Sequence, residues 1–236
     1  MLTTDDLRKK YFNSEDHPYR KYENKIVSVL RSDDTILDAG CGRTAPILRK
    51  FVGKAKILIG VDLEDSTEPL PGIRYCKGDI SSIKVPDNSI DVVISRAVLE
   101  HVIDPNAVFE EINRILKPSG RFIFLVPNLG DYVAILSLLI PNKFHKYIVS
   151  KTEGRAMEDV FPAYYKANTY SSIQKLCKSH GFEIVEFQWL GQYPASFMFS
   201  SVLFMIATLY EKIISKYECL GFLRGWLLVE LKKIKA

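Results

Sequence analysis

The sequence predicts a single α/β domain built on a mostly parallel, seven-stranded sheet with helices on both faces. Three observations lead to this prediction. Short β-branched runs alternate with segments of helical period through the first two thirds of the chain. The first three predicted strands stop at polar loops that contain a glycine or an acid, as strands do where a parallel sheet binds ligands. The length of 236 residues and the apolar fraction of 47% suit one domain, 1–236, with insertions.

The elements can be assigned in chain order. A helix over 19–30 presents one apolar face to the sheet, and a helix over 44–51 is expected after the first strand, since Pro46 is tolerated in a first turn. The stop signals of the later helices, predicted over 105–116 and 169–180, are glycines. The last predicted strand has a composition that also suits a helix. The predicted strands are 35–37, 57–61, 73–77, 90–95, 121–126, 182–189 and 225–231.

Two apolar segments interrupt this alternation, 131–161 after the fifth strand and 193–217 after the sixth. Connections that leave the carboxyl ends of parallel strands emerge at one edge of the sheet, so both segments are expected to form a helical cap over that edge. Their apolar runs are shorter than the roughly twenty residues that span a bilayer. Four roles for these segments stay open. They could bury their apolar faces on each other, form a wall for an apolar ligand, form a dimer contact, or form a peripheral membrane contact through 132–151 and 196–217.

Composition argues against several classes of partner. The 32 Lys and Arg residues exceed the 28 Asp and Glu residues only slightly, and no basic stripe interleaves with aromatics, so nucleic acid is not expected. The four cysteines form no close pair, and no metal-ligand spacing occurs, so neither a metal site nor a disulfide framework is predicted. Residues 1–25 are charged and lack the apolar stretch of a signal peptide, which favours the cytoplasm, including the inner face of its membrane.

The first strand runs into a turn that contains Gly40 and Gly42, two residues after Asp38. Two glycines a residue apart let the backbone bend sharply and approach a ligand closely. With Ala45, and with Asp62 about twenty residues on, the turn satisfies a loose dinucleotide-binding fingerprint. Asp38 argues against a pyrophosphate, because its carboxylate would repel one. The expected ligand carries positive charge near Asp38 and a ribose whose hydroxyls are free for Asp62.

Five ordered motifs extend this pattern, and they resemble the class I S-adenosylmethionine-dependent methyltransferases, in particular those that act on small molecules and lipids. The resemblance runs from about residue 19 to residue 126 and resumes near 169. It implies a Rossmann-like fold and S-adenosyl-L-methionine as the cofactor, and it leaves the acceptor open. The motifs are Ile36-Leu37-Asp38-Ala39-Gly40-Cys41-Gly42, Gly60-Val61-Asp62, Gly78-Asp79-Ile80, Leu99-Glu100-His101-Val102 and Leu116-Lys117-Pro118-Ser119-Gly120.

The resemblance also implies a cofactor contact for each matching residue. A simpler interpretation of each acid among them is a solvated strand end or a helix cap. The implied contacts are Asp38, Gly40, Cys41, Gly42, Ser95 and Arg96 for the methionine part, Asp62 for the ribose, and Leu63, Asp79 and Ile80 for the adenine.

Methyl transfer to a hydroxyl requires a base, and His101 is the first candidate because it follows the fourth strand. The simpler interpretation, which the sequence favours, is that His101 starts the next helix or packs under the cofactor. His145, Tyr164 and Tyr165 are further candidates. The predicted function is methyl transfer to oxygen or carbon of a small-molecule acceptor, including lipid-linked or glycan acceptors. The alternatives are a non-catalytic S-adenosylmethionine-binding module and an NAD(P)-binding protein.

Overall fold

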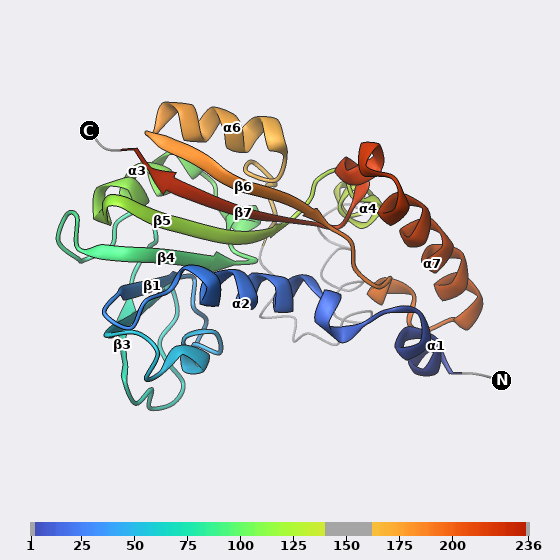
Figure 1. Cartoon of the computed structure of the whole chain (residues 1–236), viewed down its shortest axis with the longest axis horizontal. Helices are drawn as coiled ribbons and strands as arrows, with labels where there is room; N and C mark the ends of the chain where they lie inside the picture. Colours follow the sequence, from blue (N-terminus) through green and yellow to red (C-terminus); the bar gives the residue numbers. More distant parts are fainter. Residues whose placement is uncertain (1–2, 140–161, 235–236) are drawn as a thin grey trace.

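The computed structural model describes residues 3–139 and 162–234 (Figure 1). Its centre is a seven-stranded sheet in the order β3-β2-β1-β4-β5-β7-β6. β7 runs antiparallel to both of its neighbours, and the other strands share one direction. The predicted fold class is confirmed, and the segment that could have been a helix is strand β7. The strands are β1 Thr35–Ala39, β2 Ile57–Asp62, β3 Ile73–Lys77, β4 Ile90–Arg96, β5 Leu116–Pro127, β6 Phe182–Leu190 and β7 Trp226–Lys233.

Helices cover the sheet on both faces, because successive side chains of each buried strand point to opposite sides. On one face the helices α3 and α6 pack over Leu37, Phe122 and Phe124. On the other face α2 packs with Tyr22 and Ile26 over alternate strand positions. The α-helices are α1 Thr4–Tyr11, α2 Pro18–Val29, α3 Pro105–Ile115, α4 Tyr132–Leu139, α6 Tyr170–Ser179 and α7 Ser201–Lys216, and the 3-10 helices are η1 Ser14–Asp16, η2 Leu48–Phe51, η3 Leu99–His101, η5 Ala195–Phe197 and η6 Glu218–Leu223.

The helix predicted over 44–51 is wrong. The chain makes turns there and forms only the short 3-10 helix η2. Ala45 has a φ angle of 43°, in the left-handed region, and Pro46 has no N–H to donate. The earliest residue at which an α-helix could begin is therefore Pro46, and Gly53, with a φ angle of 78°, ends the segment soon afterwards. Within the described residues 40–53, the glycine turn leads into no α-helix.

Three helices lie beyond the carboxyl ends of the parallel strands: α1, α4 and α7 (Figure 1). α7 follows β6 and α4 follows β5, in the segments where helices were expected. α1 was not among the predicted helices, and its start is fixed by reciprocal hydrogen bonds between Thr3 and Asp6. α1 packs on α7, where Lys212 Nζ donates to the Tyr11 carbonyl at 2.7 Å. In the described part of the chain, no helix is long and apolar enough to cross a membrane.

Candidate functional site

The glycine turn folds over the end of β2. The N–H groups of Gly40 and Cys41 both donate to the Val61 carbonyl, at 2.8 and 3.1 Å. Gly40 has a φ angle of 83°, and a Cβ there would lie 2.3 Å from the Val98 side chain. Gly42 has a φ angle of 72°, and a Cβ there would meet no atom within 4 Å. Gly40 is therefore required by the packing of the turn, whereas Gly42 borders open space that a ligand could enter.

Asp62, the last residue of β2, holds the turn from the other side. One carboxylate oxygen of Asp62 accepts the Gly42 N–H at 2.8 Å, and the other accepts the Glu64 N–H at 3.1 Å. Each carboxylate oxygen can accept more than one hydrogen bond, so capacity is left for ribose hydroxyls. Asp62 thus shapes the turn in addition to lying where a ribose-binding acid is expected.

Asp38 is a buried acid, 2% exposed, at the start of the turn. Burial raises the pKa of its carboxyl to about 7, with Arg96 acting in the opposite direction and Asp62 in the same one. Among the described residues no hydrogen bond and no ion pair reaches this carboxylate. A buried carboxylate with no partner is costly, and a cationic ligand group would relieve that cost.

The expected adenine contacts surround the ends of β2 and β3. Leu63 is 65% exposed directly after the buried strand β2, and its side chain offers an apolar surface for a ring. Asp79 is exposed, and one of its carboxylate oxygens accepts from both the N–H and the hydroxyl of Ser81 at 2.8 Å. Ile80 is buried behind it. The Gly78 N–H donates to the Asp62 carbonyl at 2.8 Å, so these residues lie close to the glycine turn.

At the end of β4, Ser95 and Arg96 have different surroundings. The buried Ser95 hydroxyl donates to the Ala39 carbonyl at 2.8 Å, and so ties β4 to β1. The Arg96 guanidinium lies over the Tyr19 ring, 4.3 Å from its centroid. Arg96 influences the pKa of Asp38, so both lie at the same edge of the sheet. The Ser95 hydroxyl therefore has a structural partner, whereas the Arg96 side chain extends toward the start of α2.

His101 lies in η3, between its neighbour Glu100 and the distant Pro162. Its Nδ1 is 2.9 Å from the Pro162 carbonyl, and because a carbonyl only accepts, Nδ1 carries the proton. Its Nε2 is 3.9 Å from a carboxylate oxygen of Glu100. The N–H groups of Tyr164 and Tyr165 donate to the Glu100 carbonyl, which brings three of the candidate proton-transfer residues together. His145 lies outside the described residues.

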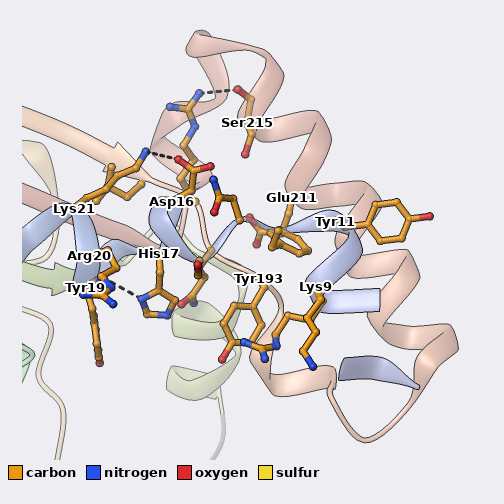
Figure 2. A pocket seen from close by; sticks show the side chains of 18 of the residues that line it. Lys9, Tyr11, Asp16, His17, Tyr19, Arg20, Lys21, Tyr193, Glu211 and Ser215 are labelled. Atoms are coloured by element: carbon orange, nitrogen blue, oxygen red, sulfur yellow. Dashed lines mark hydrogen bonds and ion pairs between the residues drawn. The ribbon is translucent and has the colours of Figure 1, made fainter. Parts of the chain in front are cut away.

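A cavity of about 1270 Å³ lies next to Arg96, between α1, η1, the start of α2, the end of β6 and α7 (Figure 2). Sequence reasoning missed it, since its lining comes from six separate parts of the chain, 8–23, 50, 96, 189–193, 211–215 and 224. The available signal is the mixture of aromatic and basic residues over 8–21. This cavity is large enough for a small organic molecule.

Comparisons with known proteins place the chain in a family. Residues 37–124 match the family model described as a methyltransferase domain. A Schizosaccharomyces pombe protein named as an uncharacterized methyltransferase is 30% identical over 194 residues, which cover 70% of this chain and 69% of that protein. The chain belongs to the class I S-adenosylmethionine-dependent methyltransferases. The cofactor of this methyltransferase is S-adenosylmethionine.

A second curated protein and a solved structure are also similar to this chain. A Mycolicibacterium smegmatis protein, named as a probable S-adenosylmethionine-dependent methyltransferase, is 27% identical over 65% of this chain, and the chain covers 62% of that protein. The crystal structure of YcgJ from Bacillus subtilis has a TM-score of 0.58 at 15% identity, and covers 92% of this chain and 99% of that one. The methyltransferase fold is therefore shared over almost the whole chain.

The residues of the site fit S-adenosylmethionine. Asp38 offers a buried carboxylate without a partner in the described structure, which suits the ammonium group of the methionine part. The open space in front of Gly42 suits the close approach of a ligand, and the exposed Leu63 side chain suits the adenine.

Proposed function

We propose that this methyltransferase transfers a methyl group from S-adenosylmethionine to oxygen or carbon of a small-molecule acceptor. The observation that carries the proposal is the buried Asp38 carboxylate beside the glycine turn, which lacks a partner in the described structure and whose pKa burial raises to about 7. The cavity of about 1270 Å³ next to Arg96 supports an acceptor of small-molecule size.

The residues of the chain bind and orient the reactants. Bound S-adenosylmethionine supplies a methyl group that its sulfonium already activates, so the protein needs no nucleophile of its own. In the proposal Asp38 holds the ammonium group, Asp62 the ribose hydroxyls, and Leu63 packs on the adenine. Gly40, Cys41 and Gly42 present their backbones to the methionine part, Ser95 and Arg96 lie below it, and Asp79 and Ile80 border the adenine.

His101 is proposed as the base for a hydroxyl acceptor. Because its Nδ1 donates to the Pro162 carbonyl, the unprotonated nitrogen of the neutral ring is Nε2, which can accept a proton. His101→Gln is then expected to lower the rate of methyl transfer by about a hundredfold or more, with little change in cofactor affinity. An unchanged rate would remove His101 from the mechanism.

The experiment for the proposed function is a transfer assay with radiolabelled S-adenosylmethionine and fractionated metabolite and lipid extracts. Incorporation of label into a small molecule by the wild-type protein, and its loss in Asp38→Asn, is the expected result. Binding of S-adenosylhomocysteine without transfer to any fraction would favour a non-catalytic binding module instead. Binding of NADH alone would favour an NAD(P)-binding protein.

We also propose that α7 rests on an anionic membrane surface, where lipid-linked acceptors would be found. Along one side of α7, Val202, Ile206, Leu209 and Ile213 are between 45% and 70% exposed, although all are aliphatic. The spacing of these residues places them on one face of the helix. The opposite face is buried in the protein. An exposed apolar helix face with a neighbouring lysine is typical of a helix at a membrane interface, and Lys216 lies in the last turn of the same helix.

A further inference from the structure

The cavity between α1, α2, β6 and α7 has a strongly basic lining (Figure 2). Nine lysines and arginines border it, against three acids. Asp16 is paired with Lys21 at 3.6 Å, and Glu23 with Lys50 at 2.6 Å. The third acid, Glu211, is buried, and burial raises its pKa to about 8, so it is mostly uncharged at neutral pH. The cavity therefore has an excess of positive charge that its own acids do not neutralise.

His17 lies in this cavity as a hydrogen-bond donor. It precedes α2, and its Nδ1 accepts the Tyr19 N–H at 3.2 Å. A neutral imidazole that accepts at Nδ1 carries its proton on Nε2, so Nε2 of His17 can donate a hydrogen bond into the cavity. Burial and then the charges of Arg8 and Arg96 lower the pKa of His17, while Glu23 acts in the opposite direction. Both guanidinium groups are therefore near enough to act on one imidazole.

Arg8 and Arg96 come from elements far apart in the chain, α1 and the end of β4. The Arg8 guanidinium lies 5.5 Å from the centroid of the Tyr193 ring, and Arg96 lies 4.3 Å from that of Tyr19. The His17 ring lies between these tyrosines, 5.0 Å from the Tyr19 centroid and 5.9 Å from the Tyr193 centroid (Figure 2). Two guanidiniums thus flank a row of three rings.

These guanidiniums have little negative charge to balance them. Within residues 3–139 and 162–234, the ion pair of Arg8 is with the exposed Asp5, at 3.3 Å, where solvent screens the interaction. For Arg96, no carboxylate in the described part of the chain lies within ion-pair distance. Guanidinium groups bind carboxylates and phosphates in paired hydrogen bonds, and the rings offer apolar surface for a carbon skeleton.

We propose that this cavity binds the anionic group, a phosphate or a carboxylate, of the methyl acceptor between Arg8, His17 and Arg96, with the adjoining carbon skeleton against Tyr19 and Tyr193. The inference rests on the proposed function and names the class of its acceptor. The connection to the cofactor site is Arg96, two residues after Ile94, which pairs with Asp38 across β1 and β4.

The test is calorimetric titration of phenyl phosphate, benzoate and benzyl alcohol into the full chain saturated with S-adenosylhomocysteine. The two anions are expected to bind and the neutral alcohol is not, and the tighter anion identifies the group. Arg8→Gln should weaken anion binding at least about tenfold, as for loss of a charge-assisted hydrogen bond, without changing the affinity for S-adenosylhomocysteine. Arg31→Gln removes the same charge from an exposed position outside the cavity and serves as the control.

Three outcomes would overturn the inference. The first is the absence of anion binding in the millimolar range while S-adenosylhomocysteine binds, which leaves the proposed function intact. The second is anion binding that Arg8→Gln and Arg31→Gln affect equally. The third is that Arg8→Gln weakens S-adenosylhomocysteine binding and that bound S-adenosylhomocysteine prevents phenyl phosphate from binding. Such a result would assign Arg8 and Arg96 to the carboxylate of the cofactor itself. Failure of S-adenosylhomocysteine itself to bind would instead contradict the proposed function.

Discussion

Asp38 shows how one side chain can link the fold to cofactor binding. It belongs to β1 and is buried, yet the described residues offer its carboxylate no hydrogen bond. Burial raises its pKa to about 7, so that a substantial part of the free protein holds Asp38 protonated at neutral pH. The ammonium group of the cofactor would pair with the ionised form only.

Cofactor affinity is therefore expected to fall as the pH decreases below about 7, because Asp38 must lose a proton before it can pair. Calorimetry with S-adenosylhomocysteine between about pH 6 and pH 8.5, in buffers of different ionisation enthalpy, measures both the affinity and the protons released. Asp38→Asn should bind at least about tenfold more weakly at the upper end and show little proton release. A pH profile identical in the two proteins would show that Asp38 does not pair with the cofactor.

The packing of Gly40 against Val98 gives a second prediction for a single residue. Gly40→Ala should lower both the melting temperature and the cofactor affinity, because the new Cβ would lie 2.3 Å from the Val98 side chain. Adding Val98→Ala should restore part of the stability, and the left-handed φ of 83° should leave a residual cost of about 1 kcal/mol. Thermal unfolding of the single and double variants checks this, and equal melting temperatures for both would show that the contact does not limit the turn.

Among the elements, α7 has two apolar faces, and only one of them belongs to the core. Phe204 is fully buried, whereas Ile206 and Leu209 are each 63% exposed. A substitution at Phe204 would disrupt packing and report on stability only. Substitutions at Ile206 and Leu209 therefore test the outer face of the helix without opening the core.

The double variant Ile206→Glu with Leu209→Glu is expected to lose binding to phosphatidylglycerol vesicles at least about tenfold, since each of these side chains contributes roughly 1.5–3 kcal/mol when fully buried in apolar surroundings. Vesicle sedimentation at low salt measures the bound fraction. Val27→Glu with Val52→Glu adds the same charge at exposed aliphatic positions outside α7 and should bind as the wild type does. If the wild type stays in the supernatant, or forms dimers that the α7 variant breaks, the membrane proposal fails.

At the scale of the molecule, Asp38, Asp131 and Glu211 are buried acids with raised pKa values, and burial is the main cause for each. The pKa is about 7 for Asp38, about 6 for Asp131 and about 8 for Glu211. The charge of Asp131 adds to the rise in the pKa of Glu211. Each acid holds its proton more tightly in the folded protein than in the unfolded chain. The stability that this provides is fully present below about pH 4, and it is lost as the pH rises through the folded pKa values.

The cofactor-free protein should accordingly become less stable between about pH 5 and pH 8.5. Each of the three acids contributes a slope of at most about 1.4 kcal/mol per pH unit. Chemical denaturation at several pH values measures the slope, and Glu211→Gln should reduce it mainly in the upper part of the range. Stability that rises steadily with pH would show that these carboxyls are ionised at little cost.

The sequence predicted the sheet well because buried strands of a parallel sheet are short, apolar and β-branched. Asp38 and Asp62 could be assigned to one edge because each ends such a strand. The helix over 44–51 could not be excluded, since the left-handed φ of Ala45 is a property of the folded turn. The hydrogen bond from the Gly42 N–H to the Asp62 carboxylate could not be predicted from the sequence either. It gives Asp62 a structural role in addition to the expected one.

The basic cavity could not be predicted for a different reason. Its central groups, Arg8, His17 and Arg96, come from α1, the residue before α2 and the end of β4. Arg96 was expected only as a contact of the cofactor, Arg8 and His17 belong to no motif, and Arg8 meets the Tyr193 ring although the two residues lie far apart in the sequence. Long-range contacts of this kind leave no periodic signal in a single sequence.

Calorimetric titration of S-adenosylhomocysteine and, separately, of NADH into the purified chain tests most directly whether the glycine turn and Asp38 form a methyltransferase cofactor site. Binding of one S-adenosylhomocysteine per chain, weakened at least about tenfold by Asp38→Asn and by Gly40→Ala, is the expected result, with no binding of NADH. Binding of NADH in place of S-adenosylhomocysteine, or S-adenosylhomocysteine affinity unchanged in both folded variants, would contradict it.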